Sequence, residues 1–143
     1  MHKKTSIPSM ARAEVAAADT TPRYPIREVA DTTGISAYTL RYYDKCGFFP
    51  HLYRDKHKVR SFSDADIEQL HLVDALRKSG LSIEGIQYYV KLDRKGAPTQ
   101  SERLAILQAR QNVLEYQLTE AQEGLRVLQA EASTLTFCLK NDG

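Results

Sequence analysis

The sequence offers little that points to a secreted protein or a membrane protein. Its 143 residues contain only two cysteines, Cys46 and Cys138, which are too few for a disulfide framework and fit a reducing cytoplasm. No stretch has the apolar length of a membrane span, and the residues that follow His2, Lys3 and Lys4 lack the apolar core of a secretory signal. We therefore expect a cytoplasmic protein with no membrane partner.

The sequence also lacks the usual signs of an enzyme. It has no Ser–His–Asp pattern, no glycine-rich phosphate loop and no pair of carboxylates in a plausible cleft. A cysteine nucleophile needs a neighbouring base, and nothing places one beside either cysteine. The four histidines (His2, His51, His57 and His71) are scattered, so no set of metal ligands converges. We expect no catalytic residue, no metal site and no cofactor.

The charge is modest overall but unevenly distributed. A net charge of +2 does not by itself indicate a nucleic-acid partner. Residues 37–60, however, hold six Lys or Arg against two Asp, whereas residues 102–140 hold four Lys or Arg against five Glu. The positive charge is therefore gathered in one segment, as in proteins that bind the phosphate backbone of nucleic acids.

Residues 26–36 have the pattern of a helix followed by a tight turn. Ile26, Val29 and Ala30 lie at helical spacing and cover one face. Gly34 supplies the left-handed backbone that ends this helix. Ser36 is placed to accept a hydrogen bond from a free amide at the start of a second helix.

The second helix, predicted for residues 37–45, presents polar and aromatic side chains. Burial of Leu40 and Tyr43 leaves four residues facing outward: Tyr38, Thr39, Arg41 and Tyr42. A short helix with Arg and Tyr after a glycine turn is typical of a DNA-reading helix-turn-helix. The alternative is an ordinary helical hairpin with a solvated basic face.

Residues 48–62 are predicted to form a hairpin, or wing. Phe48, Phe49 and Pro50 are expected to tuck under the second helix, and residues 56–58 to form the turn. The predicted contacts with the DNA backbone come from Lys56, Lys58 and Arg60, because lysine and arginine suit phosphate oxygens. The alternative is a solvated edge hairpin in which lysine guards against aggregation.

Two further helices and a long helix follow. Ser63 and Asp66 resemble a capping box, and the helix that they open ends at residues 78–80. A fourth helix places Ile83, Ile86, Tyr89 and Val90 at core spacing. Thr99 and Glu102 form a second predicted capping box, at the start of the long helix.

The long helix carries an apolar stripe in alternating steps of three and four residues from Leu104 to Leu139. This stripe predicts a coiled-coil seam over about five heptads. A core of this size cannot bury so long a stripe, so it indicates a second chain, with contacts from Leu107, Leu114, Leu118, Leu125, Leu128 and Leu135. The alternative, a helix folded back on itself, lacks the Pro or Gly pair that would divide it.

Three segments together carry a family resemblance: TLRYYDKCGFF (residues 39–49), RSFSD (60–64) and LRKSGLSIEGI (76–86). In this order, and followed by a heptad helix, they resemble the MerR family of bacterial transcription regulators over about residues 24–140. The resemblance implies an all-α dominated fold: a winged helix-turn-helix DNA-binding domain with a small β-wing, then a long antiparallel coiled-coil dimerisation helix. The expected division is a flexible tail (1–23), the DNA-binding domain (24–96) and the dimerisation helix (97–143).

The resemblance also implies a function. A homodimer would bind double-stranded promoter DNA with an overlong spacer and distort it, so that RNA polymerase engages both promoter elements. Lys78, in the second helix pair, is the residue expected at a further phosphate. An architectural or excisionase-like DNA-bending protein is the alternative, against which the long coil argues. No added effector domain is expected after Gly143, so a ligand site would lie between the coil and the helix pair.

The signal to which such a regulator responds is not evident from the sequence. Metal-sensing branches of the family carry Cys at the start of the dimer helix, where this chain has residues 98–101 (PTQS). Thiol-sensing members carry their Cys in the third helix, where this chain has none. Cys46, beside Lys45 and near Arg41, remains as a candidate redox-sensing residue. The alternative, which we favour, is an inert cysteine that packs as a small buried hydrophobic residue.

Overall fold

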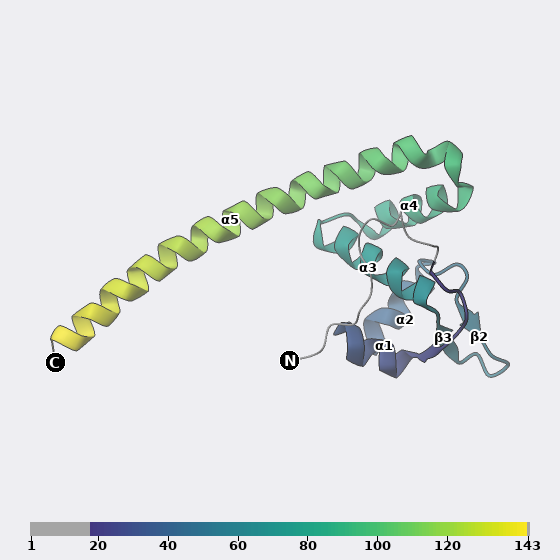
Figure 1. Cartoon of the computed structure of the whole chain (residues 1–143), viewed down its shortest axis with the longest axis horizontal. Coiled ribbons are helices and arrows are strands. Elements are labelled where there is room, and N and C mark those ends of the chain that lie inside the picture. Colours follow the sequence, from purple (N-terminus) through teal and green to yellow (C-terminus); the bar gives the residue numbers. More distant parts are fainter. Residues whose placement is uncertain (1–17, 143) are drawn as a thin grey trace.

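The computed structural model describes residues 18–142 and shows a small helical domain from which one long helix extends (Figure 1). The elements are β1 (Tyr24–Pro25), α1 (Ile26–Thr33), α2 (Ala37–Lys45), β2 (Tyr53–Arg54), β3 (Arg60–Phe62), α3 (Asp64–Lys78), α4 (Ile83–Lys95), the 3-10 helix η2 (Ala97–Thr99) and α5 (Gln100–Asn141). The predicted fold class, mainly α-helical with a small β-wing and a long C-terminal helix, is confirmed.

The turn between α1 and α2 forms as the sequence predicts. Gly34 has φ +79°, in the left-handed region that glycine adopts without a steric penalty, and its amide donates to the Ala30 carbonyl at 2.9 Å. The Ser36 hydroxyl then accepts a hydrogen bond from the Thr39 amide at 3.1 Å, which caps α2. These two local features set α2 at its angle to α1.

A single core holds the domain together. Val29 of α1, Leu40 of α2, Phe48 and Phe62 around the hairpin, and Leu70 of α3 are all buried within it. Phe49 is buried as well and packs edge-on against Phe62. Pro50, which was expected to tuck in beside Phe49, is exposed.

The sheet has one more strand than the predicted hairpin. Its order is β1-β3-β2, with both pairs antiparallel, because Tyr24–Pro25 pairs with β3. The Tyr24 hydroxyl donates to the Asp64 carboxylate at 2.8 Å, which ties β1 to the start of α3. The wing strand β3 therefore pairs with β2 on one side and with β1 on the other.

Residues 19–23 also lie against the domain, although the sequence placed them in a flexible tail. The Asp19 carbonyl accepts from the Ala65 amide at 3.0 Å, and the Arg23 amide donates to the Phe62 carbonyl at 3.0 Å. The Ala65 amide belongs to the first turn of α3, where no intrahelical acceptor exists. The rest of the predicted tail, residues 1–17, lies outside the described residues.

The two predicted capping boxes have different outcomes. At α3 the Ser63 hydroxyl accepts from the Asp66 amide and the Asp66 carboxylate accepts from the Ser63 amide, as predicted. At α5 the prediction is wrong, because the Thr99 hydroxyl donates back to the Leu92 and Gly96 carbonyls. Glu102 instead accepts from the Tyr88 hydroxyl. The helix η2 runs directly into α5, so Thr99 lies in a backbone turn that satisfies the end of α4.

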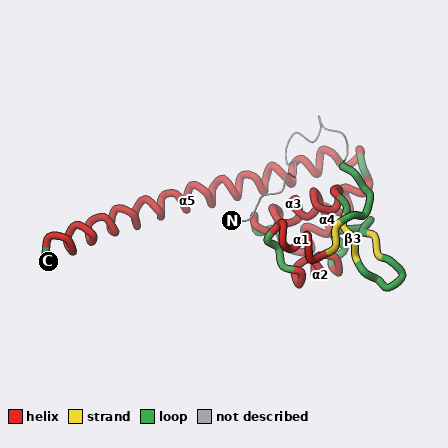
Figure 2. Tube along the Cα trace, turned by 60° about the horizontal axis from the view of Figure 1, so that its bottom comes forward, coloured by secondary structure: helices red, strands yellow, loops and turns green. Residues whose placement is uncertain are grey.

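The 42-residue helix α5 has two parts. Near its start, Ile106 and Leu107 pack against the core, and Arg110 donates to the Ser79 carbonyl at 3.2 Å. Every residue from 115 to 142 is exposed. Figures 1 and 2 both show this second part running away from the domain. Among the described residues no helix is long and apolar enough to cross a membrane.

Candidate nucleic-acid interface

The exposed face of α2 is formed by residues at helical spacing. Tyr38, Arg41, Tyr42 and Lys45 follow one another at intervals of three, one and three residues and are all exposed, Tyr38 by 80%. Such spacing places the four side chains on one face of the helix. The sequence prediction included three of them. Lys45 was not predicted, although its sequence spacing of four residues from Arg41 and three from Tyr42 places it on the same helical face.

Thr39 lies differently from the expectation that it faces outward. Its side chain is half-buried and hydrogen-bonded to the Ser36 hydroxyl at 3.1 Å, within the cap of α2. A role for Thr39 in contacting DNA therefore stays a prediction, and the structure gives it a place at the edge of the exposed face.

Tyr42 and Cys46 are neighbours on successive turns at the end of α2. Hydrogen bonding to the Cys46 thiol raises the pKa of the Tyr42 phenol above its ordinary value. A phenol is neutral at physiological pH even at its ordinary pKa, so Tyr42 is able to donate a hydrogen bond there. Cys46 is half-buried against the core, and its backbone carbonyl accepts from the side-chain amide Nε2 of Gln87 at 2.9 Å.

The tip of the wing is shaped by Asp55. Its carboxylate accepts from the amides of His57 and Val59 at 2.8 and 2.9 Å, and its carbonyl accepts from the Lys58 amide at 2.9 Å. An aspartate that bonds to the backbone two residues on is a common turn former. This turn leaves Lys56 and Lys58 exposed at the tip, as the sequence predicts for phosphate contacts.

Arg60 has a partner that the sequence did not indicate. Its Nε donates to Asp44 Oδ2 at 2.6 Å, and only 25% of its side chain is exposed. Arg54 of β2 binds the same carboxylate. Lys78 pairs with Asp74 at 3.0 Å and keeps 72% of its side chain exposed. The contacts of Arg60 and Lys78 with DNA stay predictions, and each has an acidic partner within the chain.

The predicted dimerisation residues divide between the two parts of α5. Leu107 is partly covered by the core of its own chain, and Leu114 is half-buried. The other four, farther along the helix, are more than half exposed: Leu118, Leu125, Leu128 and Leu135. Beyond residue 114, therefore, the apolar stripe has no cover within the described chain.

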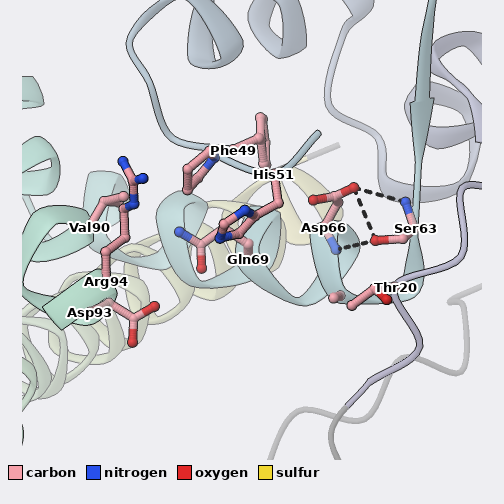
Figure 3. A pocket seen from close by; sticks show the side chains of 11 residues that line it. Thr20, Phe49, His51, Ser63, Asp66, Gln69, Val90, Asp93 and Arg94 are labelled. Carbon is pink, nitrogen blue, oxygen red and sulfur yellow. Dashed lines mark hydrogen bonds between the residues drawn. The ribbon is translucent and has the colours of Figure 1, made fainter. Parts of the chain in front are cut away.

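A shallow groove of about 430 Å³ lies between α3, α4 and the loop after Phe49, and no residue of the exposed face of α2 lines it. Figure 3 shows His51 and Gln69 in its middle, the Ser63–Asp66 cap at one end and Arg94 at the other. The Ser63 hydroxyl and the Asp66 carboxylate in this groove bond to each other and to the backbone as the cap of α3. In residues 18–142, moreover, no group of three or more His, Cys, Asp or Glu side chains is arranged to hold a metal ion.

Comparisons with known proteins agree on one family. The profile described as "MerR HTH family regulatory protein" matches residues 24–92. An uncharacterized HTH-type transcriptional regulator of Haemophilus influenzae is 34% identical over 106 residues, which cover 74% of this chain and 78% of that protein. The HTH-type transcriptional regulator YyaN of Bacillus subtilis is 30% identical over 131 residues, 83% of this chain and 95% of that protein.

A solved structure is similar over most of its length. It is that of HiNmlR, described as a MerR family regulator lacking the sensor domain, bound to promoter DNA. It superimposes with a TM-score of 0.70 and 31% sequence identity, over 80% of this chain and 91% of that one.

Proposed function

The chain belongs to the MerR family of helix-turn-helix transcription regulators, and on that premise we propose that it acts as a homodimer on double-stranded promoter DNA. Each protomer places α2 in a major groove, with Tyr38, Arg41 and Tyr42 toward the bases and backbone. The wing lysines Lys56 and Lys58 bind phosphates beside it. The observation that carries this proposal is the exposed basic and aromatic face of α2 next to the lysine-tipped wing. HiNmlR, the similar structure, is itself bound to promoter DNA.

The dimer is proposed to form through α5. The part of this helix beyond residue 114 exposes leucines at seam spacing, and an isolated helix with such a stripe is covered best by a second copy. A fixed coil sets the distance between the two α2 helices, and hence the spacing of the two half-sites on DNA.

The dimer would act in the cytoplasm. It would bend and untwist a promoter with an overlong spacer, so that RNA polymerase engages both promoter elements. The cost of such a distortion depends on the DNA sequence, which adds specificity at bases that the protein does not contact. The inducing signal would shift the dimer between a repressing and an activating arrangement.

A DNase I footprint with the purified protein tests this proposal against the architectural alternative. Protection centred on the spacer of a promoter, with a hypersensitive site in its middle and an increase of transcription in vitro, is the expected result. Protection at recombination attachment sites, with no effect on transcription, would support an excisionase-like DNA-bending protein instead.

A further inference from the structure

The carboxylate of Asp44 joins the recognition helix to both strands of the wing. Asp44 lies in the last turn of α2 with 4% of its side chain exposed. Arg54 Nη2, on β2, donates to both carboxylate oxygens, and Arg60 Nε, on β3, donates to Oδ2 at 2.6 Å. One side chain of α2 is therefore shared by the two strands whose turn carries Lys56 and Lys58.

Two arginines on one carboxylate restrict the position of the wing relative to α2 more than a single ion pair would. A guanidinium group donates within its own plane, so two guanidiniums on one carboxylate fix the directions of both side chains. Burial of the carboxylate strengthens the attraction, because solvent screens it little. The distance from the face of α2 to the wing tip is set by this contact as well as by the hairpin.

Arg54 keeps donors that Asp44 does not use. Its contacts with the carboxylate come from Nη2, which leaves the N–H groups of Nε and Nη1 among the five of a guanidinium. Its side chain is 42% exposed, on the strand that leads to the wing tip. Two arginines around one aspartate also leave one positive charge uncompensated. Arg54 is thus aligned for a second anion at the surface.

We propose that Asp44 is a positioning residue for DNA recognition, which holds the wing at its working distance from α2 and aligns Arg54 to bind a DNA phosphate. This inference rests on the proposed function. Neither residue was indicated by the sequence, because the partners of Asp44 are ten and sixteen positions away.

Asp44→Asn separates positioning from bulk electrostatics, because the two effects have opposite signs. The substitution removes a negative charge beside the DNA-facing surface, so a purely electrostatic effect would tighten binding to every sequence. If Asp44 positions the wing, binding to the promoter site weakens while binding to scrambled DNA holds or tightens. We expect the ratio of specific to non-specific affinity to fall at least about tenfold. The readout is fluorescence anisotropy on both duplexes at several salt concentrations.

Matched variants complete the test. Asp31→Asn, on the exposed end of α1, removes the same charge outside the network and should leave the ratio unchanged. Arg54→Met should weaken promoter binding. It should also make the negative slope of log affinity against log salt shallower by about one, as for the loss of one phosphate contact. Because Asp44 aligns Arg54 for this contact, Asp44→Asn should reduce the size of the same slope by up to about one.

The outcomes are distinguishable. An unchanged ratio for a folded Asp44→Asn dimer, or an equal loss on both duplexes, overturns the positioning role. An unchanged salt slope for Arg54→Met overturns the phosphate contact. Should Asp44→Asn fail to give native circular dichroism, Arg54→Lys carries the test, since lysine keeps the charge but lacks the planar fork, and full promoter affinity would then overturn the proposal. If the wild-type protein shows no preference for promoter DNA, the proposed function fails instead.

Discussion

Arg110, one helical turn after Ile106 in α5, donates a hydrogen bond to the carbonyl oxygen of Ser79 at the end of α3, at 3.2 Å. Ser79 is buried, and its hydroxyl donates to the Leu76 carbonyl at 2.6 Å. The long helix is thus attached to the corner between α3 and α4 by a side chain as well as by apolar packing.

Arg110→Met should lower the free energy of unfolding by about 1 kcal/mol, since it removes a hydrogen bond from a charged donor to a partly buried carbonyl. Urea denaturation at fixed protein concentration measures the change, because the stability of a dimer depends on concentration. Arg126→Met is the control: its ion pair with Glu123 is exposed and should contribute less than about 0.5 kcal/mol. Equal effects of the two changes would contradict a role for the Ser79 contact.

The double change Leu118→Glu and Leu125→Glu should convert the proposed dimer to a monomer. Both leucines lie on the stripe and are more than half exposed, so a second copy would bury two glutamates on each chain without partners. Light scattering would report the mass, and promoter binding should fall with it. Tyr116→Glu is the control, because Tyr116 is exposed on the opposite side of α5. A dimer that survives the double change would place the interface elsewhere.

Arg41→Ala should weaken promoter binding by about 1–3 kcal/mol, as expected for an arginine that contacts a base or a phosphate. Gel shifts over a range of salt concentrations test it. The same assay on Arg126→Ala, remote from α2, controls for the loss of a positive charge. Unchanged affinity of the Arg41 variant would remove this residue from the interface.

Ser63→Ala should lower the free energy of unfolding by about 0.5–2 kcal/mol, because it deletes the buried hydroxyl that caps α3. Thermal unfolding followed by circular dichroism measures this change. Ser101→Ala, at an exposed position in the first turn of α5, should have a much smaller effect. A thermal midpoint equal to that of the wild type would mean that other contacts hold the start of α3.

Cys46 is expected to be a packing residue, since it is half-buried against the core. Transcription in vitro should then be the same with and without diamide. Oxidation of a sensing thiol would add bulk beside Tyr42 and disturb the face of α2. A response to diamide in the wild type, lost in Cys46→Ser while promoter binding is retained, would identify Cys46 as the sensor.

Hydrogen bonds and turns between residues close in sequence were predictable. The left-handed Gly34, the Ser36 cap and the Ser63–Asp66 box depend on residues at most four positions apart. The local sequence therefore determines these three features. The exposed stripe of α5 follows likewise from a repeat of three and four residues. The sequence by itself therefore determined the order of the helices, the wing and the unpartnered coil.

Contacts between distant segments were decided only by the tertiary structure. Thr99 has the sequence of a helix cap, yet its hydroxyl serves the end of α4, because η2 brings those carbonyls within reach. Asp44 looks like a solvated charge in a basic segment, yet packing of the hairpin against α2 buries it between two arginines. A charged or polar side chain takes whichever partner the packed chain brings close. The preference of the local segment is outweighed wherever burial would otherwise leave a polar group without a partner.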